Sequence, residues 1–519
     1  MNHLRLHSDT LAIAIFLILS ATYAASFGFV SPDSWNYVRL AQSLVDGNVC
    51  QVNGKYFAIF PCGYPITLAL SSLSQDPAFI IIISKFTNAG LLLASFLCFR
   101  QLFPQHPLIA ALIIIAPSTI SISHFTWSEN LFLFATALSL LQVHRLAAKQ
   151  SYLNHVILLF ALLVGISSRY FFGPFAALIW LATLLIYGKE TARRTLPAFA
   201  IAGVAFIAYY FVNINLTGYG TGMQRIPAPE SLLYLVVHFF WTLIRYETPQ
   251  FFLVLIFFHL ATIKTIALKK PAFDSMQHKK GELLILAAGF SFLFLSFALR
   301  ATTQFDLYGF RTVGYGHTFI FVAIYALLTE SKKRGEHSFF IVILACLISF
   351  GITKRAELKE MTIALLDKKY VYKSIANQIY EYQNISDVKG FNNVVSFSVP
   401  SVGKTIASNH SYYYDKHTNL ITPSTAPYGI PEGLDSFFER IRSAKGSCVV
   451  DFKVFNTEDE FAQAMQSTFD VDLVFDTPSN RLIRVKATRY DEQLASFLMK
   501  HYEHQKLIEC SKFIEKRTK

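Results

Sequence analysis

Charged residues are scarce in this sequence. Asp, Glu, Lys and Arg make up 15% of the 519 residues, whereas hydrophobic residues make up 53%. Soluble globular domains usually carry about 25% charged residues, and the mean hydropathy here is +0.39. Long apolar runs separated by short charged breaks exclude an ordinary soluble protein. They predict a polytopic α-helical membrane protein, because helices satisfy their own backbone polar groups in lipid.

Motifs for metal or nucleotide binding are missing as well. The sequence has no spaced Cys/His motif, no P-loop and no glycine fingerprint followed by a suitable strand and helix. His124 and His317 stand alone at the ends of predicted spans, where a lone histidine is usually not a metal ligand. The formal net charge of +12 comes mostly from short loops between apolar runs. We therefore expect membrane lipids as partners and no nucleic acid.

What the sequence does contain is apolar residues in long runs. A helix needs about 20 residues to cross a bilayer, and we interpret about eleven runs as spans on that criterion. The first run has no clear cleavage site after it, so an uncleaved span is expected rather than a signal peptide. The predicted spans are residues 10–30, 77–99, 107–123, 130–146, 152–167, 170–187, 196–212, 249–268, 282–299, 313–329 and 338–352.

Basic residues give the predicted orientation of these spans. They precede the first span and follow the second, fourth, sixth, eighth and tenth spans, so alternating spans bring them all to one side. The positive-inside rule makes that side cytoplasmic. We expect a bacterial inner (plasma) membrane, a cytoplasmic N-terminus and an extracytoplasmic C-terminal part. The residues are Arg5, Arg100, Arg145, Lys149, Lys189, Arg193, Arg194, Lys269, Lys270, Lys279, Lys280, Lys332, Lys333 and Arg334.

The composition changes near residue 354, where charge rises and the apolar runs shorten. We therefore predict two domains, a membrane domain of residues 1–353 and a small soluble α/β domain of residues 354–519. Predicted strands cover residues 394–399, 448–455, 471–475 and 481–485, and predicted helices cover residues 434–443, 457–467 and 490–515.

Cysteine is rare, with six residues in the chain. Cys50 and Cys62 share the first predicted outer loop, and Cys448 and Cys510 share the predicted outer domain. An oxidising compartment allows the disulfides Cys50–Cys62 and Cys448–Cys510, and four free thiols are the alternative. The other two cysteines lie in predicted spans, where packing is expected.

The most informative stretch is residues 30–65, VSPDSWNYVRLAQSLVDGNVCQVNGKYFAIFPCGYP. It follows the first span and places Asp33 close to the membrane surface. Apolar residues from Trp35 to Leu44 recur at helical spacing. This spacing predicts a helix along the interface, with Trp35 and Tyr37 at headgroup level. An acid held there indicates chemistry on a substrate with a lipid tail and a polar head.

This stretch also carries a family resemblance, which covers the membrane part and not the last third of the chain. The residues are Pro32, Asp33, Ser34, Tyr37, Leu40, Ala41, Leu44, Gly47, Pro61, Gly63, Tyr64 and Pro65. The pattern resembles the first outer loop of GT-C glycosyltransferases, which include the protein O-mannosyltransferases and the bacterial lipid A aminoarabinose transferase. The resemblance implies a GT-C-like fold and an inverting glycosyltransferase. Such an enzyme moves a sugar from a polyprenyl-phosphate-linked donor to an envelope acceptor: lipid A or lipopolysaccharide, another glycan, or a protein.

Two acids are the candidate catalytic residues. In the resemblance, the acid of the first-loop motif, Asp33, is the base that deprotonates the acceptor; a helix N-cap is the alternative. Glu129 matches an acid that GT-C enzymes place at the start of the fourth span. It is expected to assist Asp33, to bind the acceptor or to help hold a divalent cation. The alternative is that Glu129 only stabilises the N-terminus of its helix. Apart from the divalent cation, no cofactor is expected.

Cations at outer span ends are candidates for the donor phosphate, because a leaving phosphate needs cationic stabilisation. Snorkelling to lipid headgroups is the alternative. Tyr37 and Tyr64 are candidate sugar or acceptor contacts, with interfacial anchoring as their alternative. The candidate phosphate ligands are Arg169, Arg300, Arg311 and Lys55.

Other functions remain as alternatives. A transporter or flippase of lipid-linked sugars predicts charges and broken helices near mid-membrane, and Pro117 and Pro174 keep this alternative open. A polymerase or ligase would also use outer arginines, but it does not need an acid directly after the first span. A binding module on a membrane anchor would need far fewer spans. The clustering of charges at outer span ends favours the transferase.

Overall fold

A computed structural model of the chain describes most of its first two thirds and the strands of its last third. The chain divides into two compact units, Met1–Lys359 and Glu360–Lys519. The described ranges are residues 2–28, 30–52, 55–103, 107–223, 225, 230–246, 266–268, 279–303, 308–331, 393–399, 419–421, 424–425, 430–431, 448–454, 471–477 and 480–487, with residues 351, 355, 375, 379 and 467.

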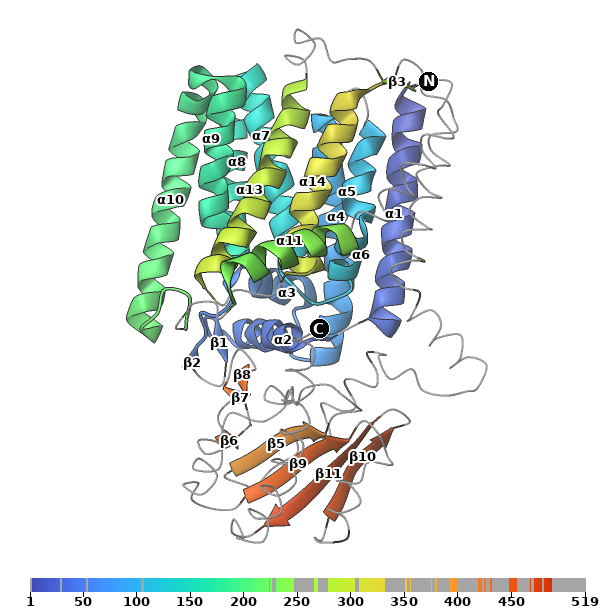
Figure 1. Cartoon of the computed structure of the whole chain (residues 1–519), viewed down its shortest axis with the longest axis vertical. Helices are drawn as coiled ribbons and strands as arrows, with labels where there is room; N and C mark the ends of the chain where they lie inside the picture. Colours follow the sequence, from blue (N-terminus) through green and yellow to red (C-terminus); the bar gives the residue numbers. More distant parts are fainter. Residues whose placement is uncertain are drawn as a thin grey trace. The chain divides into compact units, whose positions relative to one another are not determined.

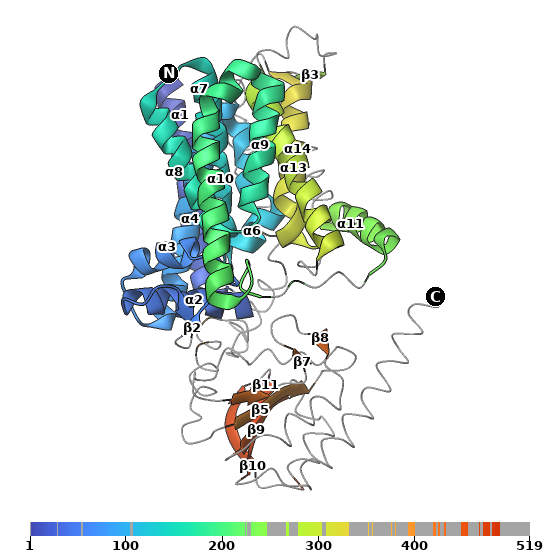
Figure 2. The ribbon, with the colours of Figure 1, turned by 90° about the vertical axis from the view of Figure 1, so that its left-hand side faces the viewer.

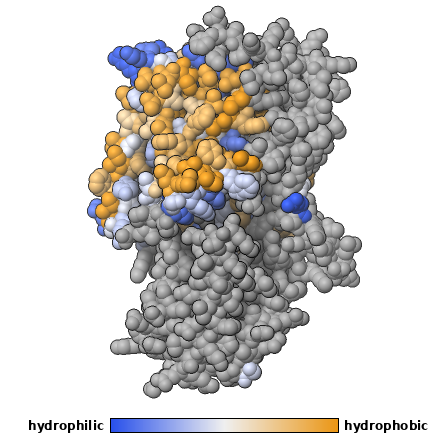
Figure 3. Space-filling model, viewed as in Figure 1, coloured by the Kyte–Doolittle hydropathy of each residue, from blue (hydrophilic) through white to orange (hydrophobic). Residues whose placement is uncertain are grey.

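The first unit is a bundle of helices, most of which run side by side, whereas α2 and α11 lie across them (Figure 1). Five helices, α1, α4, α7, α10 and α13, are long and apolar enough to cross a membrane. Large apolar side chains cover much of the bundle surface in Figure 3, as expected of a multi-pass membrane protein. The helices are α1 (Asn2–Phe27), α2 (Pro32–Val45), α3 (Gly63–Ser72), α4 (Pro77–Leu102), α7 (Glu129–Ala148), α8 (Tyr152–Ser168), α9 (Phe172–Tyr187), α10 (Lys189–Thr217), α11 (Leu232–Tyr246), α13 (Lys280–Thr302) and α14 (Phe310–Leu328).

The predicted span 107–123 is wrong as a single helix. The chain there forms a 3-10 helix, η1 (Pro107–Ala110), then α5 (Ala111–Ile115) and α6 (Pro117–Ser123). The break is at Ala116, whose φ of −53° and ψ of 140° are not helical. Steric clash with the ring of a following proline disfavours the helical region, and Pro117 follows. The segment lies in the core of the bundle, where residues 109–120 are all buried.

Two other predicted spans fall largely outside the described residues. In the span 249–268, the last three residues form a strand, β3 (Ile266–Leu268), which pairs with β4 (Thr329–Ser331). The helical prediction is therefore wrong at that end, because strand pairing competes with the helix there. In the span 338–352, the structure describes Gly351 alone, which is helical. The number of eleven spans thus stays a prediction.

Helix α2 forms where the apolar spacing predicts it, but Trp35 and Tyr37 do not lie on its outer surface as the prediction of aromatic residues at headgroup level required. The side chains of Trp35 and Tyr37 are each 1% exposed and pack inside the protein. The Tyr37 ring lies edge-on to Tyr64 with ring centroids 5.2 Å apart. Packing the rings against α3 and α4 removes more apolar surface from water than a position at the interface would, and the free energy gained by burial rises with that area.

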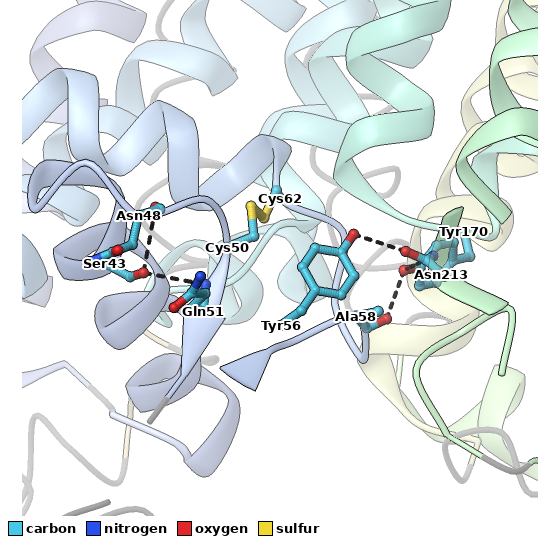
Figure 4. The surroundings of a disulfide bond; sticks show 9 residues. All are labelled: Ser43, Asn48, Cys50, Gln51, Tyr56, Ala58, Cys62, Tyr170 and Asn213. Carbon is cyan, nitrogen blue, oxygen red and sulfur yellow. Dashed lines mark hydrogen bonds between the residues drawn. A yellow bond between two sulfur atoms is a disulfide. The ribbon is translucent and has the colours of Figure 1, made fainter. Parts of the chain in front are cut away.

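The segment after α2 is held by covalent and polar contacts (Figure 4). Cys50 and Cys62 form a disulfide, with Cα atoms 6.1 Å apart, as the sequence predicted. The disulfide closes over the hairpin of β1 (Gln51–Val52) and β2 (Lys55–Tyr56). Cys98 is free and buried. Cys346, Cys510 and the side chain of Cys448 lie outside the described part, so the second disulfide stays a prediction.

Hydrogen bonds connect this hairpin to helix α10 and to the turn between α8 and α9 (Figure 4). The Tyr56 hydroxyl donates to Asn213 Oδ1 at 2.9 Å, and Asn213 Nδ2 donates to the Tyr170 hydroxyl at 2.8 Å. Tyr170 in turn donates to the carbonyl of Ala58 at 2.7 Å. The closed circuit fixes the turn after α8 against the first loop, next to Arg169.

The second unit contains a five-stranded sheet in the order β10-β11-β9-β5-β6. Its strands are β5 (Asn393–Val399), β6 (Asn419–Ile421), β9 (Cys448–Val454), β10 (Val471–Thr477) and β11 (Asn480–Ala487). Strand β5 pairs in parallel with β9 and β6, whereas β9, β11 and β10 pair antiparallel. All four predicted strands are present. The predicted helices lie outside the described residues, apart from Ser467 in a helical state, so the α/β assignment stays a prediction.

Candidate active site

Four of the predicted site residues meet at one end of the bundle. Asp33 lies in the first turn of α2, and Glu129 is the first residue of α7. Arg169 directly follows α8, and Arg311 is in the first turn of α14. Successive helices run in alternating directions, so the end of α8 lies at the same end as the starts of α7 and α14. The four residues come from distant parts of the sequence and form one cluster.

Arg311 connects the two acids. Its Nη1 donates to Asp33 Oδ2 at 2.5 Å, and its Nε donates to Glu129 Oε1. Arg169 Nη1 donates to the same oxygen of Glu129. The Glu129 side chain is 2% exposed, whereas that of Asp33 is 28% exposed. Asp33 is therefore the carboxylate that a substrate can reach, and Glu129 is the buried acid that orients both arginines.

Asp33 is not the N-cap of α2. That position belongs to Ser31, whose side chain accepts from the backbone N–H of Ser34 at 3.2 Å. A serine at this position satisfies a backbone donor that the helix leaves unpaired. The Asp33 carboxylate is thus available for its ion pair with Arg311, and the capping alternative does not hold.

Trp127 supports the guanidinium of Arg311. The Arg311 Cζ lies 4.4 Å from the centre of the indole ring, a distance at which a cation is attracted to the π face. The indole N–H donates to the hydroxyl of Ser31 at 2.6 Å, which fixes the ring against the start of α2. Phe125 stacks on the other aromatic surface, with ring centroids 3.9 Å apart. Ser31 therefore connects the ring of Trp127 to the start of α2, two residues before Asp33.

The loop before Glu129 is held from inside the bundle by Lys85. This lysine of α4 is 1% exposed, and its Nζ donates to the carbonyl of His124 at 2.7 Å and to Thr126 Oγ1 at 3.2 Å. The hydroxyl of Tyr37 bonds Ser128 at 2.9 Å, one residue before Glu129. Burial raises the pKa of the Tyr37 hydroxyl, which therefore stays protonated. Together these contacts fix the position of the Glu129 carboxylate.

A small cavity lies beside the cluster. It is lined by Glu129, Arg169, Arg311, Ser296 and Tyr315, among others. Its volume is about 10 Å³, close to the space of one water molecule. The second oxygen of Glu129, Oε2, has no hydrogen-bond partner among the described residues. A buried carboxylate oxygen normally has a partner, so this oxygen of Glu129 can accept a further hydrogen bond.

The cluster does not fit a divalent cation in this arrangement. Asp33 and Glu129 are both paired with guanidinium groups, and two carboxylates with two arginines leave no net negative charge. Cations such as Mg²⁺ are held by carboxylates that are not already neutralised. Within the ranges that the structure describes, no group of three or more His, Cys, Asp or Glu side chains is placed to hold a metal ion.

Of the other predicted site residues, Tyr37 supports the cluster through Ser128, and Arg300 and Tyr64 have partners outside it. Arg300, at the end of α13, pairs with Glu230. Lys55 belongs to β2, and its side chain lies outside the described part. The hydroxyl of Tyr64 donates to Asn88 Oδ1 at 2.9 Å, and this ring and that of Tyr37 are buried. Both tyrosines thus bond to protein groups here, and their role as sugar contacts stays a prediction.

Sequence reasoning missed three residues that position the cluster: Ser31, Lys85 and Trp127. Lys85 had a usable signal, since a lysine within an apolar run is costly in a membrane and usually has a specific partner. Trp127 stands two residues before Glu129, but an indole near a span end is ordinarily an interfacial anchor. Nothing in the local sequence of Ser31 shows that it accepts a bond from a residue nearly a hundred positions away.

The sequence matches no protein-family model and no curated protein. Among solved structures, the fold is similar to ArnT from Cupriavidus metallidurans in the apo state, with a TM-score of 0.55 at 10% identity, over 93% of this chain and 98% of that chain. ArnT bound to undecaprenyl phosphate gives a TM-score of 0.50 at 11% identity, with the same coverage. The Archaeoglobus fulgidus oligosaccharyltransferase in the apo form covers 85% of this chain and 69% of that chain, with a TM-score of 0.42 at 12% identity. The resemblance predicted from the sequence is thus confirmed at the level of the fold, because the chain has a fold similar to that of ArnT.

Proposed function

We propose that this protein is a glycosyltransferase of the membrane that takes a sugar from a polyprenyl-phosphate-linked donor. The acceptor is an envelope molecule on the extracytoplasmic face: lipid A or lipopolysaccharide, another glycan or a protein. The observation that carries the proposal is the cluster of Asp33, Arg311, Glu129 and Arg169 at one end of a bundle with the ArnT fold. ArnT has been observed with undecaprenyl phosphate, which supports the class of donor.

In the proposed reaction, Asp33 is the general base. Its carboxylate takes the proton of the acceptor hydroxyl while the hydroxyl oxygen attacks the anomeric carbon of the donor. The bond between that carbon and the phosphate oxygen breaks, and its electron pair stays on the lipid phosphate. Attack from the face opposite the leaving group inverts the anomeric configuration. The 28% exposure of the Asp33 side chain supports its role as the reacting acid.

Arg311 and Arg169 receive the charge that develops on the leaving phosphate. Fixed guanidinium groups at the point where charge develops stabilise a transition state more than mobile solvent does. In the structure, Arg311 already bonds Asp33 and Glu129 through Nη1 and Nε. A phosphate that binds Arg311 would share this guanidinium with both acids. The ion pair between Asp33 and Arg311 supports a proposal in which the base and the phosphate ligand are neighbours.

The test compares envelope glycans by mass spectrometry in a deletion strain complemented with wild type, Asp33→Asn or Asp46→Asn. Asp46 lies at the other end of α2, is exposed and contacts Gln75, so its variant controls for loss of an acid from the same helix. We expect wild type and Asp46→Asn to restore a missing sugar and Asp33→Asn to fail at equal expression. Full restoration by Asp33→Asn would falsify the role of Asp33 as base.

Transport of a lipid-linked sugar is the second candidate, and two observations favour it. Lys85 is a buried charge within a candidate span, and the helix break at Ala116 lies in the core of the bundle. Broken helices and buried charges occur at the binding sites of transporters. Proteoliposomes with a fluorescent polyprenyl-phosphate sugar distinguish the two: a transporter moves the lipid between leaflets without an acceptor, whereas a transferase consumes it only with one.

A further inference from the structure

A second site lies at the end of the bundle opposite the Asp33 cluster. Helices α8 and α10 pack side by side (Figure 2), and a groove of about 560 Å³ runs between their N-terminal halves. Arg169 ends α8, whereas His155 in the groove lies in its first turn. At a rise of 1.5 Å per residue, the two residues are about 21 Å apart along the helix. The groove is therefore separate from the candidate active site.

The groove changes character along its length. At the helix starts it is lined by His155, Val156, Arg193 and Arg194, and further along by Leu159 and Ile201. Ile201 lies eight residues beyond Arg193, which corresponds to about 12 Å along α10. A small soluble anion would occupy the cationic part alone and leave the apolar part empty. A molecule with an anionic head and a hydrocarbon chain matches both parts.

The charges at the cationic end favour a negative head. Arg194 Nε pairs with Glu190 Oε1 at 3.0 Å, so these two charges offset each other. Arg193 is exposed, and among the described residues it has no ion pair. One net positive charge therefore remains at the opening of the groove. Arginine binds phosphate oxygens through two parallel N–H groups, which makes Arg193 a suitable phosphate ligand.

The surroundings of the groove are those of a surface in contact with lipid. Large apolar side chains flank it on both helices, among them Leu153, Phe160 and Val204, which are 63%, 56% and 68% exposed. A groove in such a surface opens toward acyl chains rather than toward water. From this geometry we infer that the α8–α10 groove binds one anionic phospholipid, with its phosphate on Arg193 and an acyl chain along Val156, Leu159 and Ile201.

The test is native mass spectrometry of the full-length protein in detergent, titrated with dioleoyl phosphatidylglycerol or dioleoyl phosphatidylethanolamine. Wild type is expected to retain one phosphatidylglycerol in preference to phosphatidylethanolamine. Arg193→Gln should weaken that binding about five- to tenfold, whereas Glu190→Gln, which removes the opposite charge one turn away, should not weaken it. Lys149→Gln removes an exposed cation outside the groove lining and should leave it unchanged.

A variant with all charges in place tests the apolar half. Ile201→Trp fills the groove beside Pro197 and should displace the lipid at an unchanged melting temperature. If Ile201→Trp binds phosphatidylglycerol as wild type does, the lipid is attracted by surface charge alone and the groove is not its site. The assignment to an anionic lipid is overturned if Arg193→Gln leaves phosphatidylglycerol binding unchanged. It is also overturned if phosphatidylethanolamine binds as well as phosphatidylglycerol and Glu190→Gln weakens phosphatidylglycerol binding.

Discussion

Two neighbouring helix ends each carry an arginine whose side chain is mostly shielded from solvent, and the two arginines have different partners. Arg300, at the end of α13, pairs with Glu230, which precedes α11. Arg311, at the start of α14, bonds Asp33 and Glu129, which lie 278 and 182 positions away in the sequence. The first pair fastens one neighbouring segment, whereas the second connects α2, α7 and α14. The two arginines therefore differ in how many helices their ion pairs connect, rather than in how far they are shielded from solvent.

The largest difference is expected between the two glutamates. Glu129→Gln removes the charge that faces both Arg169 and Arg311 in a site where its side chain is 2% exposed. Loss of one partner from a buried ion pair costs about 3–5 kcal/mol. Glu230→Gln should cost less, because that side chain is 19% exposed and faces one arginine. Thermal unfolding in detergent measures both, and equal shifts of the midpoint would remove the distinction.

The next effect concerns transfer itself. Arg311→Ala should lower the amount of completed glycan by about 10²–10³-fold, the range seen when one donor to a developing oxyanion is removed. Arg300→Ala is expected to lower thermal stability more than transfer, because Glu230 is left without its partner. Quantitative glycan mass spectrometry at matched expression compares the two variants. An equal loss of transfer would place Arg300 at the donor phosphate as well.

A smaller effect is expected from the disulfide of the first loop. Replacing Cys50 and Cys62 together by serine releases the closed hairpin, whose short loop contributes about 3 kcal/mol through the unfolded chain. Hydrogen exchange over residues 50–62 should become faster, with the remainder of the bundle unchanged. Cys98→Ser is the control, since that thiol is free and buried. Unchanged exchange in the double variant would show that the Tyr56–Asn213 contacts hold the loop alone.

The smallest effect should come from Trp127→Phe. The variant keeps an aromatic ring under Arg311 but loses the bond to Ser31 and the stronger indole face, a cost of about 1–2 kcal/mol. Transfer should fall several-fold. Trp180→Phe also loses an indole hydrogen bond, to the carbonyl of Ala192, but the described contacts place no cation on that ring. If both tryptophan variants behave alike, the contact with Arg311 has no measurable effect.

Much of the candidate site could be predicted from the sequence. Asp33, Glu129, Arg169 and Arg311 were all predicted to lie on one side of the membrane, because spans of similar length in alternating directions place every second connection at the same face. The sequence favoured Arg311 over Arg300 only slightly, because the setting of Arg311, Tyr308 to Thr312, resembles a late outer loop of the GT-C enzymes. Both are arginines at predicted outer span ends, and their ion pairs in the structure separate them: Arg300 pairs with Glu230, whereas Arg311 pairs with Asp33 and Glu129.

Other errors have local causes. Pro117 indicates a helix break at Ala116, but the long apolar run on both sides of it favoured the prediction of one continuous span. Trp35 and Tyr37 have the spacing and composition of an interfacial helix, and the same residues suit a buried face. The amphipathic pattern therefore identified the helix, but not which surface its aromatic side would cover.

The sequence by itself determined that this is a multi-pass membrane protein with acids and arginines at one face. Those properties follow from local hydropathy and from the cost of charge in lipid, which act on each segment separately. Only the tertiary structure decided that Arg311 joins Asp33 to Glu129, that Lys85 and Trp127 hold them, and that α8 and α10 leave a cationic groove at the far end. Such pairings depend on which helices pack together, and helix packing is set by side-chain shape over the whole bundle rather than by any one segment.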